Sequence, residues 1–209
     1  KEKPFIKITN IVKDLKSFNS KEKPYETDGY IFTPVNEAYN KMKVYKYKPI
    51  EKLTCDFVIR ECPKELLGIE PYISGNKTLY ILFCSIGEKT AYNLKIEKIK
   101  YYNKLFPNVS KNIPIQFTPS NKKDAYLYWG EPGLDNNVGE FRVPNYKDEI
   151  SKYKWELVRI REDRKELLST GKYWGNYHKF VEFNWMTYSD PLIIEELDTD
   201  VYFKKHDND

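Results

Sequence analysis

The sequence predicts an α+β fold that is rich in β-strands. Short apolar or alternating runs, bounded by glycine, proline and asparagine, recur along most of the chain. One stretch between them has apolar residues at spacings of three and four, which predicts an amphipathic helix. Several short strands with one interposed helix are typical of a small Greek-key barrel of the OB type. The residues of this helical stretch are Tyr92, Ile96, Ile99, Tyr102 and Phe106.

The other elements follow in chain order. A weak helical pattern passes through Leu15 and Phe18 within residues 1–20. A helix is also expected over residues 176–197, and the polar, acidic residues after it are typical of a linker. Strands are predicted at 29–34 (GYIFTP), 43–49 (KVYKYKP), 54–60 (TCDFVIR), 79–86 (LYILFCSI), 113–118, 125–129, 140–143 and 155–160, with a boundary near Pro63.

Composition limits the class of protein. The chain has 209 residues, of which 40% are hydrophobic and 32% charged, so we expect a globular protein. Its formal charge of +4 fits a polyanionic partner without requiring one. The longest apolar run, residues 79–86, is far shorter than the roughly 20 residues that span a bilayer. The chain begins with Lys1 rather than Met, so we expect it to be part of a longer protein.

The cysteines point away from disulfide and zinc chemistry. Cys55, Cys62 and Cys84 are odd in number and form no CxxC pair, which favours a reducing compartment. His178 and His206 are the only histidines, so no Cys/His cluster suited to zinc is expected.

Asp28 and Gly29 begin the run ETDGYIF. A carboxylate beside glycine at the start of a strand can hold a divalent metal, because glycine lets a phosphate approach the backbone closely. The alternative is that Asp-Gly is a simple turn.

Lys46 and Lys48 lie in the run YKYKP. Residues two apart on a strand share a face, so their two ammonium groups would point the same way, an arrangement suited to a phosphate. The alternative is a solvated basic edge strand.

The run 155–164, WELVRIREDR, grades from apolar residues into arginines. If the strand continued to its end, alternation would place Trp155, Leu157, Arg159, Arg161 and Asp163 on one face. The planar fork of arginine grips phosphate oxygens at two points, so this face could bind a polyphosphate. The alternative is a surface ion-pair network among Arg159, Glu162 and Arg164.

In this order, the runs resemble the covalent nucleotidyltransferases, and within them the mRNA capping enzymes. ETDGYIF is similar to that family's fourth motif (EVDGLIF), YKYKP to its fifth (LKWKP), and TCDF to the TIDF that follows it. WELVRIREDR resembles the sixth motif, a tryptophan followed by RxRxDK. The runs CPKELLG, KLFPNV, IPIQFTPS and GKYWGNYHKFVEFNWMTYSDPLIIEEL resemble capping enzymes of large cytoplasmic DNA viruses, of the asfarvirus and mimivirus kinds.

The resemblance implies domains as well as chemistry. Residues 1–60 would be the C-terminal part of a nucleotidyltransferase domain, 61–197 an OB-fold domain with C-terminal helices, and 198–209 a linker. In the family, the lysine of a KxDG motif attacks the α-phosphate of GTP, and the bound GMP then passes to the 5′-diphosphate end of RNA. This chain contains no KxDG, so we expect the nucleophile to lie upstream and this fragment alone to be inactive.

The resemblance also assigns roles to residues. Asp28 would bind Mg²⁺ or Mn²⁺, and Lys46 and Lys48 would contact the α-phosphate of GTP. Asp56 would support the site from behind or have a purely structural role. The GTP-binding residues of the sixth motif would be Arg159, Arg161, Asp163 and Arg164, the last in place of the family's lysine.

Partners and location follow from the same resemblance. The family's viral members carry an RNA triphosphatase before this region and a cap methyltransferase after it. The partners would be GTP and 5′-diphosphate RNA, with no membrane. The expected location is the host cytoplasm, in the virus factory, or the virion.

Two other functions stay open at the level of sequence. An ATP-dependent polynucleotide ligase of the same superfamily shares the lysine chemistry. A non-catalytic OB module that binds single-stranded nucleic acid would need a basic groove with aromatic side chains directed into it. In such a module Asp28 would have no function, which counts against this alternative.

Overall fold

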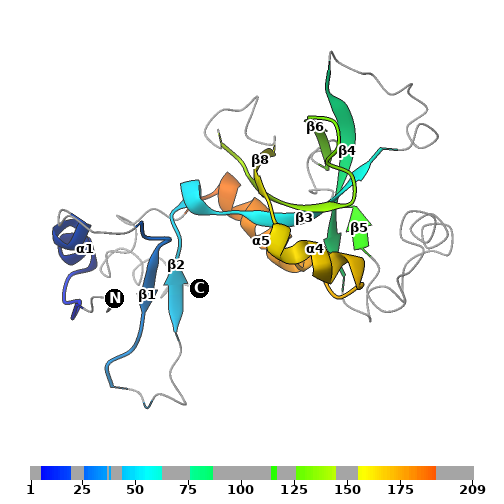
Figure 1. Cartoon of the computed structure of the whole chain (residues 1–209). Helices are drawn as coiled ribbons and strands as arrows, with labels where there is room; N and C mark the ends of the chain where they lie inside the picture. Colours follow the sequence, from blue (N-terminus) through cyan, green and yellow to red (C-terminus); the bar gives the residue numbers. More distant parts are fainter. Residues whose placement is uncertain are drawn as a thin grey trace, which may run out of the picture. The chain divides into compact units, whose positions relative to one another are not determined.

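The computed structural model describes residues 6–19, 26–36, 38, 44–62, 76–86, 114–116, 126–144 and 155–191 (Figure 1). The chain forms two compact units, of which the second is Leu53–Ser189. The sequence placed the domain boundary after residue 60, whereas the strand Cys55–Glu61 is part of the second unit. The assignment of residues 1–60 to a nucleotidyltransferase domain stays a prediction.

The first unit contains a helix and a hairpin. Helix α1 (Ile11–Asn19) begins after Asn10, whose Oδ1 accepts a hydrogen bond from the Lys13 amide at 2.9 Å. Such a side-chain cap satisfies one of the free N–H groups at a helix start. Strands β1 (Tyr30–Phe32) and β2 (Tyr45–Tyr47) pair antiparallel, and the short 3₁₀ turn η1 (Ile50–Lys52) follows them.

The second unit is built on a six-stranded antiparallel sheet. Strand β3 pairs with both β4 and β7, β8 pairs with β7, and both β5 and β6 pair with β4. The first strand therefore lies between the second and a later one, which is a Greek-key order. The strands after β3 (Cys55–Glu61) are β4 (Thr78–Ser85), β5 (Pro114–Gln116), β6 (Leu127–Gly130), β7 (Asn137–Arg142) and β8 (Glu156–Ile160).

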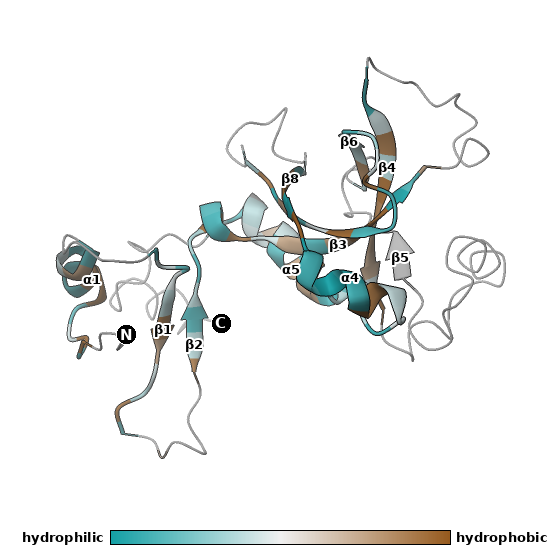
Figure 2. Cartoon of the chain, viewed as in Figure 1, coloured by the Kyte–Doolittle hydropathy of each residue, from teal (hydrophilic) through white to brown (hydrophobic). Residues whose placement is uncertain are grey.

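Both faces of β3 are covered by apolar side chains. On one face, Val58 and Val138 belong to a buried cluster with Leu168 and Trp174. On the other, the ring of Phe57 lies 5.7 Å from that of Phe141 and 4.9 Å from that of Trp155. In Figure 2 the hydrophobic colour is strong along β4, whose middle residues are also buried. This burial on two sides explains why β3 and β4 read as nearly continuous apolar runs.

Two helices follow the sheet. Helix α4 (Glu162–Ser169) buries Leu168, and helix α5 (His178–Ser189) packs Trp185 against Trp155, with ring centroids 5.3 Å apart. The side-chain amide of Asn184 donates to the carbonyl of Thr54 at 3.3 Å. Figure 1 shows α4 and α5 beside the curled sheet.

The predicted α+β, strand-rich class with an OB-type sheet and C-terminal helices is confirmed. The strands predicted from the sequence are observed, with shifted ends. The helix expected over 176–197 is confirmed over His178–Ser189, and α4 was not predicted. The helix predicted through Tyr92–Phe106 and the tail 198–209 lie outside the described residues. Within the described ranges, no helix has the length and apolar character needed to cross a bilayer.

Candidate functional site

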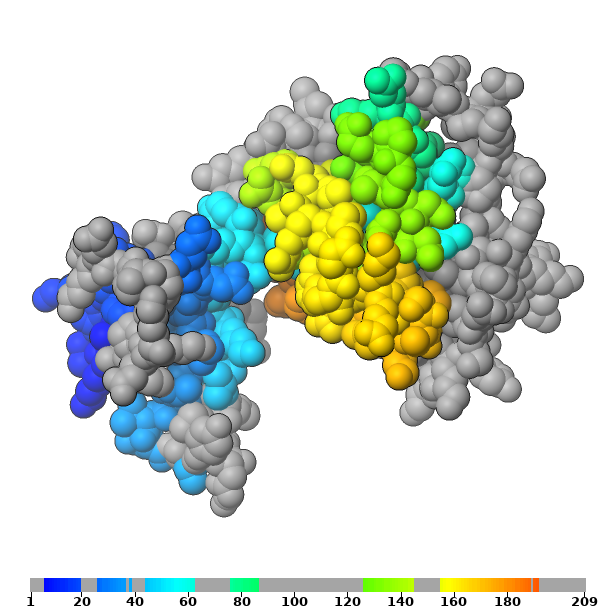
Figure 3. Space-filling model, in the orientation of Figure 1, coloured from blue at the N-terminus to red at the C-terminus, as the bar shows by residue number. Residues whose placement is uncertain are grey.

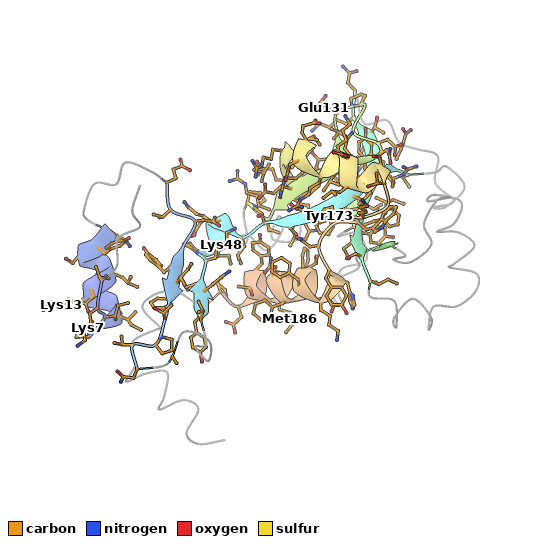
Figure 4. All side chains as sticks on the ribbon, turned by 60° about the horizontal axis from the view of Figure 1, so that its bottom comes forward. Lys7, Lys13, Lys48, Glu131, Tyr173 and Met186 are labelled. Atoms are coloured by element: carbon orange, nitrogen blue, oxygen red, sulfur yellow. The ribbon has the colours of Figure 1, made fainter. Side chains whose placement is uncertain are left out.

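The first group of predicted site residues lies at one end of the hairpin. Asp28 precedes β1 and Lys48 follows β2, as Figure 4 shows for Lys48. The Lys48 Nζ lies 3.3 Å from the Asp28 Oδ1. The Asp28 side chain is 82% exposed, so this ion pair is open to water and to any incoming ligand. An exposed pair of this kind contributes little to stability and is easily exchanged.

Gly29 allows the two strands to come this close. Its φ is +147°, which disfavours residues with a side chain, and a Cβ there would collide with the carbonyl oxygen of Tyr47. Beside it, the rings of Tyr30 and Tyr47 stack with centroids 6.1 Å apart. The Asp-Gly pair is therefore more than a turn, because the glycine fits the start of β1 against the end of β2.

Lys46 lies within β2, opposite Ile31, and is exposed. Lys48 lies just beyond the strand and is directed to Asp28. That both ammonium groups meet one phosphate stays a prediction.

Asp28 also fits the divalent metal expected from the sequence. Within the described ranges, no three His, Cys, Asp or Glu side chains cluster as metal ligands. Mg²⁺ commonly takes only one or two carboxylates from the protein and fills its other positions with phosphate oxygens and water. A single exposed carboxylate therefore suits a metal that arrives with a nucleotide.

The second group lies where β8 ends and α4 begins, and here one sequence prediction was wrong. In the pairing with β7, Leu157 lies opposite Phe141 and Arg159 opposite Glu140, with Val158 as an extra residue between them. This β-bulge places Leu157 and Arg159 on opposite faces. The strand also ends at Ile160, so Asp163 lies in the first turn of α4 and not on the strand.

Arg161 is the centre of this group. Its Nη1 donates to both carboxylate oxygens of Asp56, at 3.1 and 2.9 Å. Its Nε and Nη2 donate to the two oxygens of Asp163, each at 2.8 Å. The side chains of Arg161 and Asp56 are only 17% and 9% exposed. Asp56, whose role was left open, is thus the buried partner that holds Arg161.

Asp163 is the exposed partner, with 59% of its side chain accessible. The hydrogen bonds from Arg161, aided by the charge of Arg164, lower the pKa of Asp163 to about 2. The Arg164 guanidinium lies 4.9 Å from the ring centroid of Tyr173. Its Nε is buried without a hydrogen-bond partner among the described residues, and the nearest charge is Asp163 Oδ2 at 3.4 Å. The Arg164 side chain as a whole is 36% exposed, so an anion can approach its guanidinium from the solvent side.

Arg159 makes a separate pair beside this group. Its Nε lies 2.6 Å from Glu140 Oε2, and Glu140 Oε1 accepts from the Thr54 hydroxyl at 2.8 Å. Burial alone would raise the pKa of Glu140, but the hydrogen bonds from Arg159 and Thr54 hold it below its usual value. The sequence had allowed an ion-pair network with Glu162, but Glu162 pairs with Lys165, at 3.8 Å.

The arrangement is therefore three arginines matched by three carboxylates, open on one side. The atoms of β8 and α4, yellow in Figure 3, lie on the visible surface of their unit. A phosphate could replace the exposed Asp163 at Arg161 without disturbing the buried Asp56. The three pairs are those of Arg159 with Glu140, Arg161 with Asp56, and Arg164 with Asp163.

Sequence reasoning missed two contributors, Glu140 and Tyr173. The hydroxyl of Tyr173 donates to Asp56 Oδ2 at 2.8 Å. A usable signal was the run GKYWGN, in which two glycines flank Tyr173 and Trp174. Glu140 had no comparable signal, because its role depends on lying opposite Arg159 across the sheet.

The structure thus brings the predicted residues together in two groups. Each group belongs to a different compact unit. The convergence of both groups on one nucleotide stays a prediction. The hairpin group is Asp28 and Lys48 with Lys46 nearby, and the sheet group is Arg159, Arg161, Asp163 and Arg164.

The cysteines take no part in either group. All three are buried, and none is in a disulfide. Burial raises the pKa of the Cys62 and Cys84 thiols, so neither is poised to act as a thiolate nucleophile.

The fold and these contacts define the second unit as an OB-type domain that carries a solvent-facing arginine site braced by carboxylates. By sequence, the chain is similar to one part of viral mRNA-capping enzymes. It is 36% identical over 209 residues to an mRNA-capping enzyme of African swine fever virus, covering 93% of this chain. It is 28% identical to a probable mRNA-capping enzyme of Acanthamoeba polyphaga mimivirus, covering 87% of this chain.

These matches cover most of this chain but only a small part of each relative. The chain spans 24% of the length of the first relative and 17% of the second. No family model matches the chain, and no solved structure matches it. The similarity to capping enzymes therefore rests on these relatives, and it confirms the resemblance seen in the motifs.

Proposed function

We propose that this chain is part of an mRNA guanylyltransferase, which transfers GMP from GTP to the 5′-diphosphate end of RNA. Two findings support the proposal: the similarity to viral capping enzymes, and the Arg161 site at the position of the family's sixth motif. The single observation that carries it is that Arg161 is fixed by a buried carboxylate on one side and by an exposed one on the other.

The proposed chemistry has two displacements. A neutral lysine amine attacks the α-phosphorus of GTP, a nitrogen–phosphorus bond forms, and pyrophosphate leaves with the electron pair of the broken bond while the amine loses a proton. A terminal oxygen of the RNA diphosphate then attacks the same phosphorus, the nitrogen–phosphorus bond breaks, and the lysine nitrogen keeps the electron pair and takes up a proton. This is covalent catalysis in two easier steps. Because the chain has no KxDG, we place that lysine outside these 209 residues.

Asp28, Lys46 and Lys48 would act at the α-phosphate. The two ammonium groups would stabilise the charge that builds up on the phosphate oxygens during attack. Mg²⁺ or Mn²⁺ bound at Asp28 would supply further neutralisation of phosphate charge. In the absence of nucleotide, the pairing of Lys48 with Asp28 keeps both groups at the same end of the hairpin.

Arg159, Arg161 and Arg164 would act at the β- and γ-phosphates, and Asp163 would hold Arg161 until a phosphate takes its place. A phosphate that displaces Asp163 would receive the Nε and Nη2 edge of Arg161, which suits a two-point grip. The partly exposed guanidinium of Arg164 would add a further positive charge beside it. Holding these oxygens would orient the leaving pyrophosphate.

The remaining proposals concern the longer protein. We place an RNA triphosphatase before this region, a cap methyltransferase after it, and the whole enzyme in the host cytoplasm or the virion.

Labelling with nucleotides tests the proposed function. We expect the longer enzyme that contains this chain to form a covalent adduct with α-labelled GTP and not with α-labelled ATP, and the 209-residue chain alone to form neither. An adduct with ATP would favour the ligase alternative. No adduct with either nucleotide would contradict the proposal, and labelling of the isolated chain would contradict the placement of the lysine.

A further inference from the structure

Tyr173 lies in the run 171–197, for which the sequence predicted no role in the site, yet it contacts two members of the arginine site. Its hydroxyl donates to Asp56 Oδ2 at 2.8 Å, and Asp56 in turn holds Arg161. The face of its ring lies 4.9 Å from the Arg164 guanidinium carbon. Figure 4 shows Tyr173 beside the sheet of the second unit. One side chain thus supports two neighbouring arginines by two different contacts.

The segment that carries Tyr173 is fixed to the backbone of β3. The Asn176 amide donates to the Asp56 carbonyl at 2.8 Å, and the Asp56 amide donates to Asn176 Oδ1 at 2.7 Å. Gly175 has a φ of +79°, and a Cβ there would lie 2.7 Å from the Asp56 carbonyl oxygen. Trp174 is buried in the cluster with Val58. Tyr173 is therefore placed by contacts on both sides of it and has little freedom to move.

The buried carboxylate of Asp56 depends on its partners. A charge with this little exposure is costly unless it is paired and hydrogen-bonded. Arg161 supplies the opposite charge and donates to both oxygens, and the Tyr173 hydroxyl adds a second donor at Oδ2. Burial and the neighbouring Asp56 raise the pKa of Tyr173, so its hydroxyl keeps the proton that it donates. The hydrogen bond therefore restrains the carboxylate plane that orients Arg161.

We propose that Tyr173 is a positioning residue for the phosphate-binding arginines, since it fixes Arg161 through Asp56 and supports Arg164 with its ring. This inference rests on the proposed function of the arginine site. Arg161 is held from its buried side by Asp56 and from its exposed side by Asp163. When a phosphate replaces Asp163, the carboxylate of Asp56, with Tyr173 behind it, still holds the Nη1 side of the guanidinium. Tyr173 therefore matters most in the nucleotide-bound state.

The test compares two variants in the longer enzyme that contains this chain. Tyr173→Phe removes only the hydroxyl, and we expect it to lower kcat/KM for GTP in adduct formation about 10-fold, as loss of a hydrogen bond to a charged group commonly does. Tyr173→Leu also removes the ring, and we expect a loss of about 50-fold. Most of the change should appear in KM, because the arginines would bind the leaving phosphates in the ground state as well.

Tyr188→Phe is the matched control. Its hydroxyl is also buried in the second unit, but it donates to the backbone carbonyl of Leu53 at 2.6 Å and not to a carboxylate. We expect it to lower the melting temperature as Tyr173→Phe does, while leaving the kinetics within about 2-fold. Tyr173→Phe kinetics equal to this control would overturn the inference.

A second measurement does not depend on catalysis. In the 209-residue chain, the Nε–Hε NMR resonance of Arg161 should shift in Tyr173→Phe and stay in place in Tyr188→Phe. An Arg161 resonance that is unchanged in Tyr173→Phe would also overturn the inference.

Arg161→Lys separates this inference from the proposed function. If Arg161→Lys greatly lowers adduct formation while Tyr173→Phe does not, the proposed function stands and the role of Tyr173 is wrong. If Arg161→Lys has no effect, the arginine site itself is wrong and the inference falls with it.

Discussion

The two compact units hold similar ion pairs in opposite surroundings. In the hairpin unit, Asp28 and Lys48 pair where their side chains are 82% and 32% exposed. In the sheet unit, Asp56 and Arg161 pair where theirs are 9% and 17% exposed. An exposed pair contributes little stability, whereas breaking a buried pair leaves a charge without compensation. From this difference we infer that the hairpin pair offers its charges to a ligand, whereas the sheet pair holds an arginine in place.

The largest expected effect is on catalysis in the hairpin. Lys48→Ala should slow formation of the GMP adduct by about 10² to 10³-fold, the loss typical of removing a group that stabilises transition-state charge. It should change the free energy of unfolding by no more than about 0.5 kcal/mol, because the pair is exposed. Single-turnover labelling and urea denaturation measure the two quantities. A large loss of stability with unchanged catalysis would show that the hairpin pair is structural and does not act on a ligand.

The next largest effect is on stability in the sheet. Asp56→Asn removes the charge beside buried Arg161, and we expect it to cost about 3 kcal/mol in the free energy of unfolding. The matched variant Asp28→Asn in the hairpin should cost less than about 0.5 kcal/mol. Urea denaturation of the 209-residue chain compares them, and equal costs would show that the two pairs do not differ.

The smallest effect is a dependence of stability on acid. Arg161 and Arg159 lower the pKa values of Asp163 and Glu140, that of Asp163 to about 2. A carboxyl group whose pKa is lowered by folding stabilises the protein above its unfolded pKa and loses that contribution as the pH falls through its folded pKa. The melting temperature should therefore fall between about pH 4.5 and pH 2.

A double variant separates this local effect from general acid unfolding. Asp163→Asn with Glu140→Gln should flatten part of the fall in melting temperature. A pH profile identical to that of the unchanged chain would show that these two carboxyl groups do not contribute to it.

The strands could be predicted from the sequence because their signals are local. Alternation and continuous apolar runs identified the core strands β3 and β4, and Asp-Gly identified the start of β1. The two strand predictions put Asp28 just before the first strand and Lys48 near the end of the second, but the antiparallel pairing that brings them together was not predicted.

Helix α4 could not be predicted in the same way. Its N-cap is Arg161, which makes no side-chain capping hydrogen bond, so the usual Ser, Thr, Asp or Asn signal is missing. The acidic residues Glu162 and Asp163 in its first turn favour a helix start, but they also fit the alternation of a charged strand. Packing of Leu168 into the core decides between the two, and that contact is not visible in the local sequence.

The arginine site was predicted in part for the same reason. Its arginines were found because they follow one another in the chain. Asp56 was expected to support the site only through the family resemblance, and Glu140 and Tyr173 were not expected there. The sheet register and the segment around Gly175 bring these three side chains to the arginines.

The two hydrogen bonds between Asp56 and Asn176 also affect the order of folding. They join residues 120 positions apart in the chain, and such distant contacts form slowly because a long loop must close first. During synthesis, every strand of the sheet can emerge and pair before Tyr173 and Asn176 leave the ribosome. The arginine site is therefore expected to mature last, after the sheet that carries it has already formed.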